Sequence, residues 1–76
     1  MCVYKITGYD EPDEPFRLVK NDSVVIYESW TLANVWHYMR EIVRSDYTCF
    51  VSDGKTNVTG LSWLAQMVYV GFIDRL

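Results

Sequence analysis

The feature that most constrains this chain is a run of fourteen uncharged residues, 60–73, near the end of a 76-residue sequence. A helix that is apolar on all sides usually lies in a large core or in a membrane. A membrane span needs about 17–25 apolar residues, so this run is too short to be one. A domain of 76 residues, in turn, has little interior in which to bury a whole helix. We therefore expect a helix here whose two apolar sides pack against different parts of the protein or of a partner.

Helical geometry divides the run into two stripes. Thr59 or Ser62 can cap the start of the helix, and Gly71 can end it. The stripe that we expect to face the sheet consists of Leu61, Leu64, Ala65, Val68 and Phe72. The opposite stripe consists of Trp63, Met67 and Val70. A charge-free surface with Trp and Met is typical of a partner interface, in the simplest case a two-fold homodimer. The alternative is that the chain's own remaining elements cover it.

Before this run, the hydrophobic pattern predicts three strands. Residues 2–7 alternate between apolar and polar side chains, as a half-buried strand does. The pair Asn21-Asp22 tolerates the positive φ of a tight turn and separates two β-prone runs, 16–20 and 23–29. We therefore expect an antiparallel hairpin. The candidates for its buried face are Phe16, Leu18, Val24 and Ile26.

A long amphipathic helix is predicted within residues 28–46, with Ser29 or Thr31 as its cap. Its apolar residues recur at three- and four-residue steps and give one continuous stripe on the core side. The stripe consists of Leu32, Val35, Trp36, Met39, Ile42 and Val43.

A second hairpin signal, Asp53-Gly54, follows this helix. It separates a predicted strand in residues 47–52 from a polar segment, 55–59, that is either a short edge strand or a loop. The order of elements predicts an α+β fold, with a small, mainly antiparallel sheet of three to five strands and two helices packed on one face. No linker or repeat interrupts the sequence, so residues 1–76 are expected to form one domain.

Residues that could support catalysis or bind a metal are few. His37 is the only histidine, and it lies on the polar side of the first predicted helix with Glu41 four residues on. One histidine and two distant cysteines, Cys2 and Cys49, do not supply a four-ligand zinc site. The sequence GKT at 54–56 lacks the preceding glycine of a phosphate-binding loop. We therefore expect a protein that is not an enzyme and that binds neither a metal nor a cofactor.

Acidic residues are concentrated in one loop, residues 10–14, which holds four of the ten carboxylates in a chain of net charge −3. This acidic loop contains Asp10, Glu11, Asp13 and Glu14. Pro12 within the loop and Pro15 directly after it restrict its backbone. The simpler interpretation is a stiff, solvated loop. The more specific one is a surface that binds a basic partner, where complementary charge speeds association and gives specificity.

An alternative site lies on the first predicted helix, where positive charge and aromatic rings combine. It consists of Trp30, His37, Arg40 and Arg44. Arginines contact phosphates, and aromatic rings stack on bases, so such a surface can bind nucleic acid. Two arginines interleaved with Glu41 in a net negative chain make nucleic acid the less favoured partner.

The favoured function is therefore a small, non-enzymatic protein-binding module. A short acidic domain of this kind resembles in type the phage-encoded or mobile-element proteins that bind and inhibit a host protein. No basic segment followed by an apolar one stands at the N-terminus, as a secretory signal would require. With two widely spaced cysteines, we expect a cytoplasmic protein with reduced thiols. A small nucleic-acid-binding or regulatory domain is the alternative.

Overall fold

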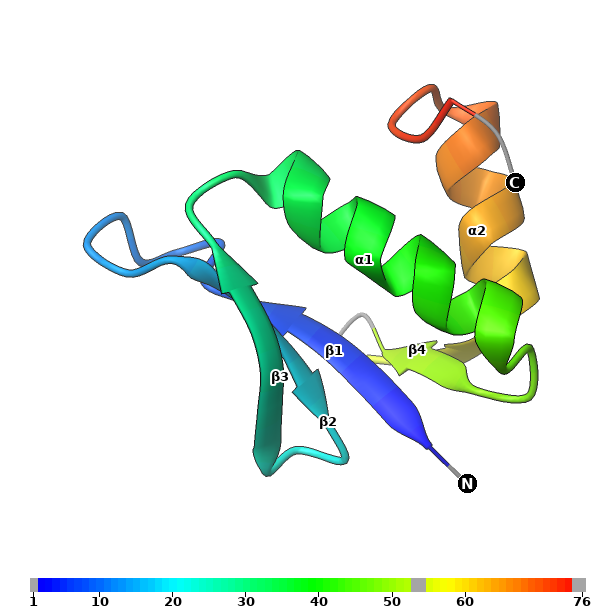
Figure 1. Cartoon of the computed structure of the whole chain (residues 1–76), viewed down its shortest axis with the longest axis horizontal. Coiled ribbons are helices and arrows are strands. Elements are labelled where there is room, and N and C mark those ends of the chain that lie inside the picture. Colours follow the sequence, from blue (N-terminus) through cyan, green and yellow to red (C-terminus); the bar gives the residue numbers. More distant parts are fainter. Residues whose placement is uncertain (1, 53–54, 75–76) are drawn as a thin grey trace.

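The computed structural model of the chain describes residues 2–52 and 55–74. In these residues, five strands form one sheet and two helices pack on one face of it (Figure 1). The elements are, in order, β1 (Val3–Thr7), β2 (Phe16–Lys20), β3 (Val24–Ser29), α1 (Leu32–Ser45), β4 (Phe50–Ser52), β5 (Asn57–Thr59) and α2 (Gly60–Tyr69). The predicted α+β class and the mainly antiparallel sheet are confirmed. None of the helices described is long and apolar enough to cross a membrane.

The strands lie in the order β3-β2-β1-β4-β5. Neighbouring strands are antiparallel except β1 and β4, which are parallel, so the sheet is mixed. The parallel pair arises because α1 carries the chain over the sheet before β4 begins (Figure 1). α1 contacts β2 and β3, whereas α2 contacts β4 and β5. The two helices therefore cover different halves of the same face.

The predicted turn between β2 and β3 is confirmed. Asn21 and Asp22 have φ angles of 54° and 62°, the positive values that a type I′ turn needs at both central residues. The Ser23 N–H closes the turn on the Lys20 carbonyl at 3.2 Å. Asn21 also anchors the turn to β1, because its side-chain Oδ1 accepts from the Val3 N–H at 3.0 Å. The Asp53-Gly54 turn lies outside the described residues, but β4 and β5 on either side of it pair antiparallel.

The prediction of the buried face of this hairpin is wrong for one residue, Val24. Leu18 is fully buried, and Phe16 and Ile26 pack half-buried against the core, but Val24 is 52% exposed. Val24 pairs with Lys20 beside the turn. That end of the hairpin projects away from both helices (Figure 1), so nothing covers the Val24 side chain there.

The register of β2 and β3 shifts between Leu18 and Val19, which the sequence pattern does not reveal. Leu18 pairs with Tyr27, and Val19 pairs with Val25. An extra residue of this kind turns the strand and changes which side chains face inward. Tyr27 consequently faces α1, where its ring stacks on Tyr38 with centroids 4.4 Å apart.

The core forms between the sheet and the two helices. The predicted stripe of α1 is confirmed at its centre, where Val35, Met39 and Val43 are buried. No polar or charged residue in the described part of the chain is buried as a whole. One buried polar atom, Arg40 Nε, has no hydrogen-bond partner there. The buried hydrophobic residues are Tyr4, Leu18, Val35, Met39, Val43, Cys49, Val51, Leu64 and Ile73.

The start of α2 is fixed by a cap and a close contact. Thr59 is the N-cap, and its side-chain oxygen accepts from the Ser62 N–H at 3.1 Å. Gly60 follows and donates its N–H to the Cys49 carbonyl at 2.8 Å. A Cβ at Gly60 would lie 2.8 Å from Cys49 Sγ and 2.9 Å from Val43 Cγ2. Only glycine lets the first turn of α2 approach α1 and the residue before β4 this closely.

Gly71 ends α2 as predicted. Its φ of 89° reverses the chain, and its N–H donates to the Val68 carbonyl at 3.1 Å. The Phe72 N–H donates to the Met67 carbonyl at 3.0 Å, which completes a Schellman motif. The reversal brings Ile73 back into the core, where it is buried.

Candidate functional site

The side of α2 that packs on the core is rotated relative to the predicted stripe. Leu64 is buried as expected, but Leu61 is 54% exposed and Ala65 is also exposed. Trp63 and Met67, expected on the opposite side, are half-buried against the core instead.

The physical reason for this rotation is Gly60, which lies one turn before Leu64, directly against Val43 of α1 and Cys49, the residue before β4. Because glycine has no side chain, it adds nothing to a hydrophobic pattern, and Leu61 takes its place in the predicted stripe. Phe72 is also exposed. It lies beyond Gly71, where the chain is no longer helical, so the helical spacing does not apply to it.

A groove of about 720 Å³ lies between α2 and the segment that ends β1. We call it the α2 groove. One wall is the side of α2 that carries Trp63, Gln66, Met67 and Val70, whose three- and four-residue spacing places them on one helical face. The end of β1 and the residues after it, as far as Glu11, form the other wall. β4 and β5 contribute Val51, Ser52 and Val58.

The α2 groove joins two of the surfaces predicted from the sequence. All three residues of the predicted apolar stripe, Trp63, Met67 and Val70, lie along it. Two of the four carboxylates of the acidic loop, Asp10 and Glu11, lie along its opposite wall. Asp13 and Glu14, the other two, do not line the groove.

Two aromatic residues that were not among the predicted partner-binding residues also line the groove. Tyr9 and Phe72 both line it and are both more than half exposed. Phe72 stacks on Trp36 of α1, and Tyr9 contacts Phe16 edge-on at a centroid distance of 5.8 Å. These positions depend on the reversal at Gly71 and on the loop after β1, so no spacing rule could have indicated them.

Tyr9 also ties the acidic loop to α1. Partial burial raises the pKa of the Tyr9 hydroxyl, and a hydrogen bond with the Trp36 side chain acts in the opposite direction. Trp36 therefore lies close to Tyr9 and stacks on Phe72 of the C-terminal segment.

The acidic loop is folded back on itself rather than extended. Gly8 has a φ of 102°, and a Cβ there would lie 2.8 Å from the Pro15 carbonyl oxygen, so the two ends of the loop touch. Inside it, the Glu11 N–H donates to the Gly8 carbonyl at 3.3 Å, and the Glu14 N–H donates to the Glu11 carbonyl at 3.1 Å. These bonds hold the carboxylates of the loop close together.

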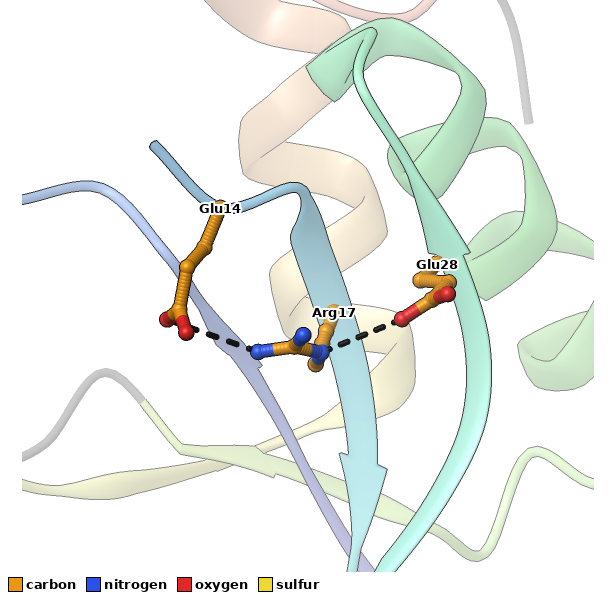
Figure 2. A network of polar contacts seen from close by, with 3 residues as sticks. All are labelled: Glu14, Arg17 and Glu28. Atoms are coloured by element: carbon orange, nitrogen blue, oxygen red, sulfur yellow. Dashed lines mark hydrogen bonds and ion pairs between the residues drawn. The ribbon is translucent and has the colours of Figure 1, made fainter. Parts of the chain in front are cut away.

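Arg17 forms an ion pair with one carboxylate of the loop, Glu14. It lies between Glu14 and Glu28, with N–O distances of 3.5 Å and 3.1 Å (Figure 2). No ion pair joins Asp10 or Glu11 to a basic residue in 2–52 or 55–74. A side-chain hydrogen bond with Glu14 and the charge of that carboxylate raise the pKa of Glu11. The carboxylates on the groove side therefore have no ion-pair partner in these ranges, and the charge of Arg17 only partly offsets the effect of Glu14 on the pKa of Glu11.

The alternative basic and aromatic surface is less concentrated. Trp30 is 67% exposed and precedes α1, whereas Arg44 lies in its last turn, roughly 20 Å away at 1.5 Å per residue. Arg40 and Arg44 both pair with Glu41, at 3.6 Å and 3.8 Å. His37 is exposed on the same helix. The structure therefore gathers the two arginines around a carboxylate and leaves Trp30 at the other end.

Groups suited to catalysis or metal binding are not clustered in the described residues. No set of three or more His, Cys, Asp or Glu side chains there could hold a metal ion. Cys2 and Cys49 are free thiols. Burial is the main cause that raises the pKa of Cys49, which disfavours the reactive thiolate.

Comparisons with known proteins do not extend this description. No family model, no curated protein and no solved structure matches the chain. The chemistry of the α2 groove must therefore be argued from its own lining, which combines apolar walls with two carboxylates and contains neither His nor Cys.

Proposed function

We propose that this chain is a non-enzymatic protein-binding module and that the α2 groove is its binding surface. The observation that carries the proposal is the meeting of the charge-free side of α2 with Asp10 and Glu11 in one groove of about 720 Å³. Binding sites are typically concave and mostly apolar, with a few polar groups that set orientation. Both predicted partner surfaces would then act together as one site.

The exposure of the groove residues supports this proposal. Val70 is 49% exposed, and Trp63 and Met67 are half-buried with their remaining surface on the groove. Apolar surface removed from water contributes about 25 cal/mol per Å², and Trp and Tyr are enriched among the residues that dominate interface energies. A partner that covers Val70 and the exposed rings of Tyr9 and Phe72 would therefore gain the most binding free energy from this surface.

We further propose that the module acts as an inhibitor of the kind that phages and mobile elements direct at host proteins. A compact acidic domain that occupies a basic surface prevents that surface from binding its ordinary ligand. Complementary charge would also speed the encounter. Two free thiols are consistent with action in a reducing compartment such as the cytoplasm.

Affinity capture from native host cells, with bound proteins identified by mass spectrometry, tests the proposed function. The bait is compared with two variants, Val70→Gln and Leu61→Gln. Both residues lie at α2 with similar exposure, 49% and 54%, but only Val70 lines the groove. We expect a protein that the wild type and Leu61→Gln retain and that Val70→Gln loses. A set of captured proteins that Val70→Gln leaves unchanged would contradict the proposal. Light scattering separates self-association from a heterologous partner.

A further inference from the structure

We infer that the occupant of the α2 groove is a partner segment with apolar anchors beside an arginine or lysine, and that this cation binds at Asp10 and Glu11. The inference rests on the proposed function and specifies the chemistry of the partner. It also excludes a second copy of the chain as the occupant of the groove.

The apolar part of the segment follows from the α2 wall. From Gly60 to Tyr69 the helix carries no charged residue, so no ionic group of α2 competes for the occupant. The lining residues from Trp63 to Val70 extend over about two turns, or roughly 10 Å. An amphipathic helix presents its anchor residues to a groove at the same three- and four-residue spacing over two turns. A volume of about 720 Å³ is ample for several side chains.

The cation follows from the charges around the groove. Asp10 and Glu11 are exposed and line it, and no basic residue in the described ranges pairs with them. Lys5 is the one basic residue in the lining. No ion pair joins Lys5 to either carboxylate.

A neighbouring contact adds to the negative potential at this end of the groove. Glu14 lies beside Glu11, and its hydrogen bond and charge raise the pKa of the Glu11 carboxyl. Arg17 is held between Glu14 and Glu28 (Figure 2). A cation from a partner would relieve the repulsion between the Glu11 and Glu14 carboxylates, which a neutral or acidic segment could not do.

Charge also argues against a second copy of the chain. A two-fold interface brings identical surfaces together, so two acidic loops would approach each other in a chain of net charge −3. The arginines of the described residues are engaged, Arg17 with two glutamates and both Arg40 and Arg44 with Glu41. A heterologous basic segment is therefore the better match.

The test uses two synthetic peptides with the same amphipathic apolar stripe of Leu and Trp, one flanked by Arg and the other by Glu. Each is titrated into ¹⁵N-labelled full-length chain at low salt and followed by NMR. We expect shifts along residues 5–11 and 63–70 and an affinity for the Arg peptide at least about tenfold above that for the Glu peptide. The double variant Asp10→Asn/Glu11→Gln should weaken Arg-peptide binding about three- to tenfold.

The control for this variant is Asp22→Asn/Glu41→Gln, which removes the same charge outside the groove and should leave the affinity within about twofold. Equal affinity for both peptides, unchanged affinity in the groove variant, or shifts spread outside the groove would each overturn the inference. If both peptides bind equally and Val70→Gln abolishes both, the proposed groove stands and only the cation requirement fails. If neither peptide binds, the inference falls, and the capture experiment alone judges the proposed function.

Discussion

The rings of Trp36 and Phe72 stack with centroids 4.9 Å apart and an angle of 21° between their planes. The contact joins the first half of α1 to the segment after α2. It therefore holds Phe72 in position at the end of the α2 wall of the groove. It depends on the reversal at Gly71, which turns Phe72 towards α1 and Ile73 into the core. The shape of the α2 groove is therefore coupled to a single glycine.

The first prediction concerns Gly71. Its φ is 89°, and a Cβ there would meet no atom within 4 Å, so Gly71→Ala isolates the backbone cost of a left-handed conformation. We expect a loss of about 1–2 kcal/mol in the free energy of unfolding, measured by urea denaturation. If the backbone were instead in an ordinary conformation, alanine would stabilise the chain by restricting its unfolded state. A gain in stability would therefore contradict the reversal.

The second prediction concerns Gly60, where the cost is steric. Gly60→Ala places a Cβ 2.8 Å from Cys49 Sγ and 2.9 Å from Val43 Cγ2, and overpacking of this kind costs about 1–3 kcal/mol. Cys49→Ala removes the sulfur and should reduce that penalty. A double-mutant cycle from denaturant titrations measures the coupling. Independent, additive effects of the two substitutions would show that the close contact is absent.

These two glycines also show why the sequence predicted the elements better than their packing. The Asn21-Asp22 turn and the stripe of α1 were predictable because each rests on local backbone preference or helical spacing. The orientation of α2 was not, because the contact that sets it involves the missing side chain of Gly60. The α2 groove itself joins Glu11 and Val70, residues far apart in sequence, and no local pattern encodes that proximity.

The third prediction concerns the pH dependence of stability. Because Glu14 raises the pKa of Glu11 in the folded state, folded chains bind that proton more tightly than unfolded ones. The free energy of unfolding should therefore fall as pH rises through and above the ordinary glutamate pKa of about 4.3. Glu11→Gln removes the carboxylate that causes this fall in the free energy of unfolding. The variant should therefore be more stable than the wild type at pH 7, and the difference should be much smaller at pH 3. Thermal unfolding at the two pH values measures the difference, and an equal effect at both would contradict the repulsion.

The fourth prediction concerns nucleic acid, the alternative partner. Arg40 and Arg44 are paired with Glu41, so we expect no binding to duplex DNA or single-stranded RNA in fluorescence anisotropy at low salt, where electrostatic affinity is greatest. Binding that Arg44→Ala and Trp30→Ala both weaken would instead establish the helix surface as the site.

The most direct test of the α2 groove is the dissociation constant of the captured partner for the wild type, Val70→Gln and Leu61→Gln, measured by calorimetry. Leu61 and Tyr69 lie on the outward side of α2 and are exposed without lining the groove. Leu61→Gln therefore tests whether the partner binds this outward side instead of the groove. We expect Val70→Gln to weaken binding about tenfold or more, as loss of an apolar anchor does, and Leu61→Gln to change it less than about twofold. The reverse order, with Leu61→Gln the damaging substitution, would place the partner on the outward side of α2 and contradict binding in the groove.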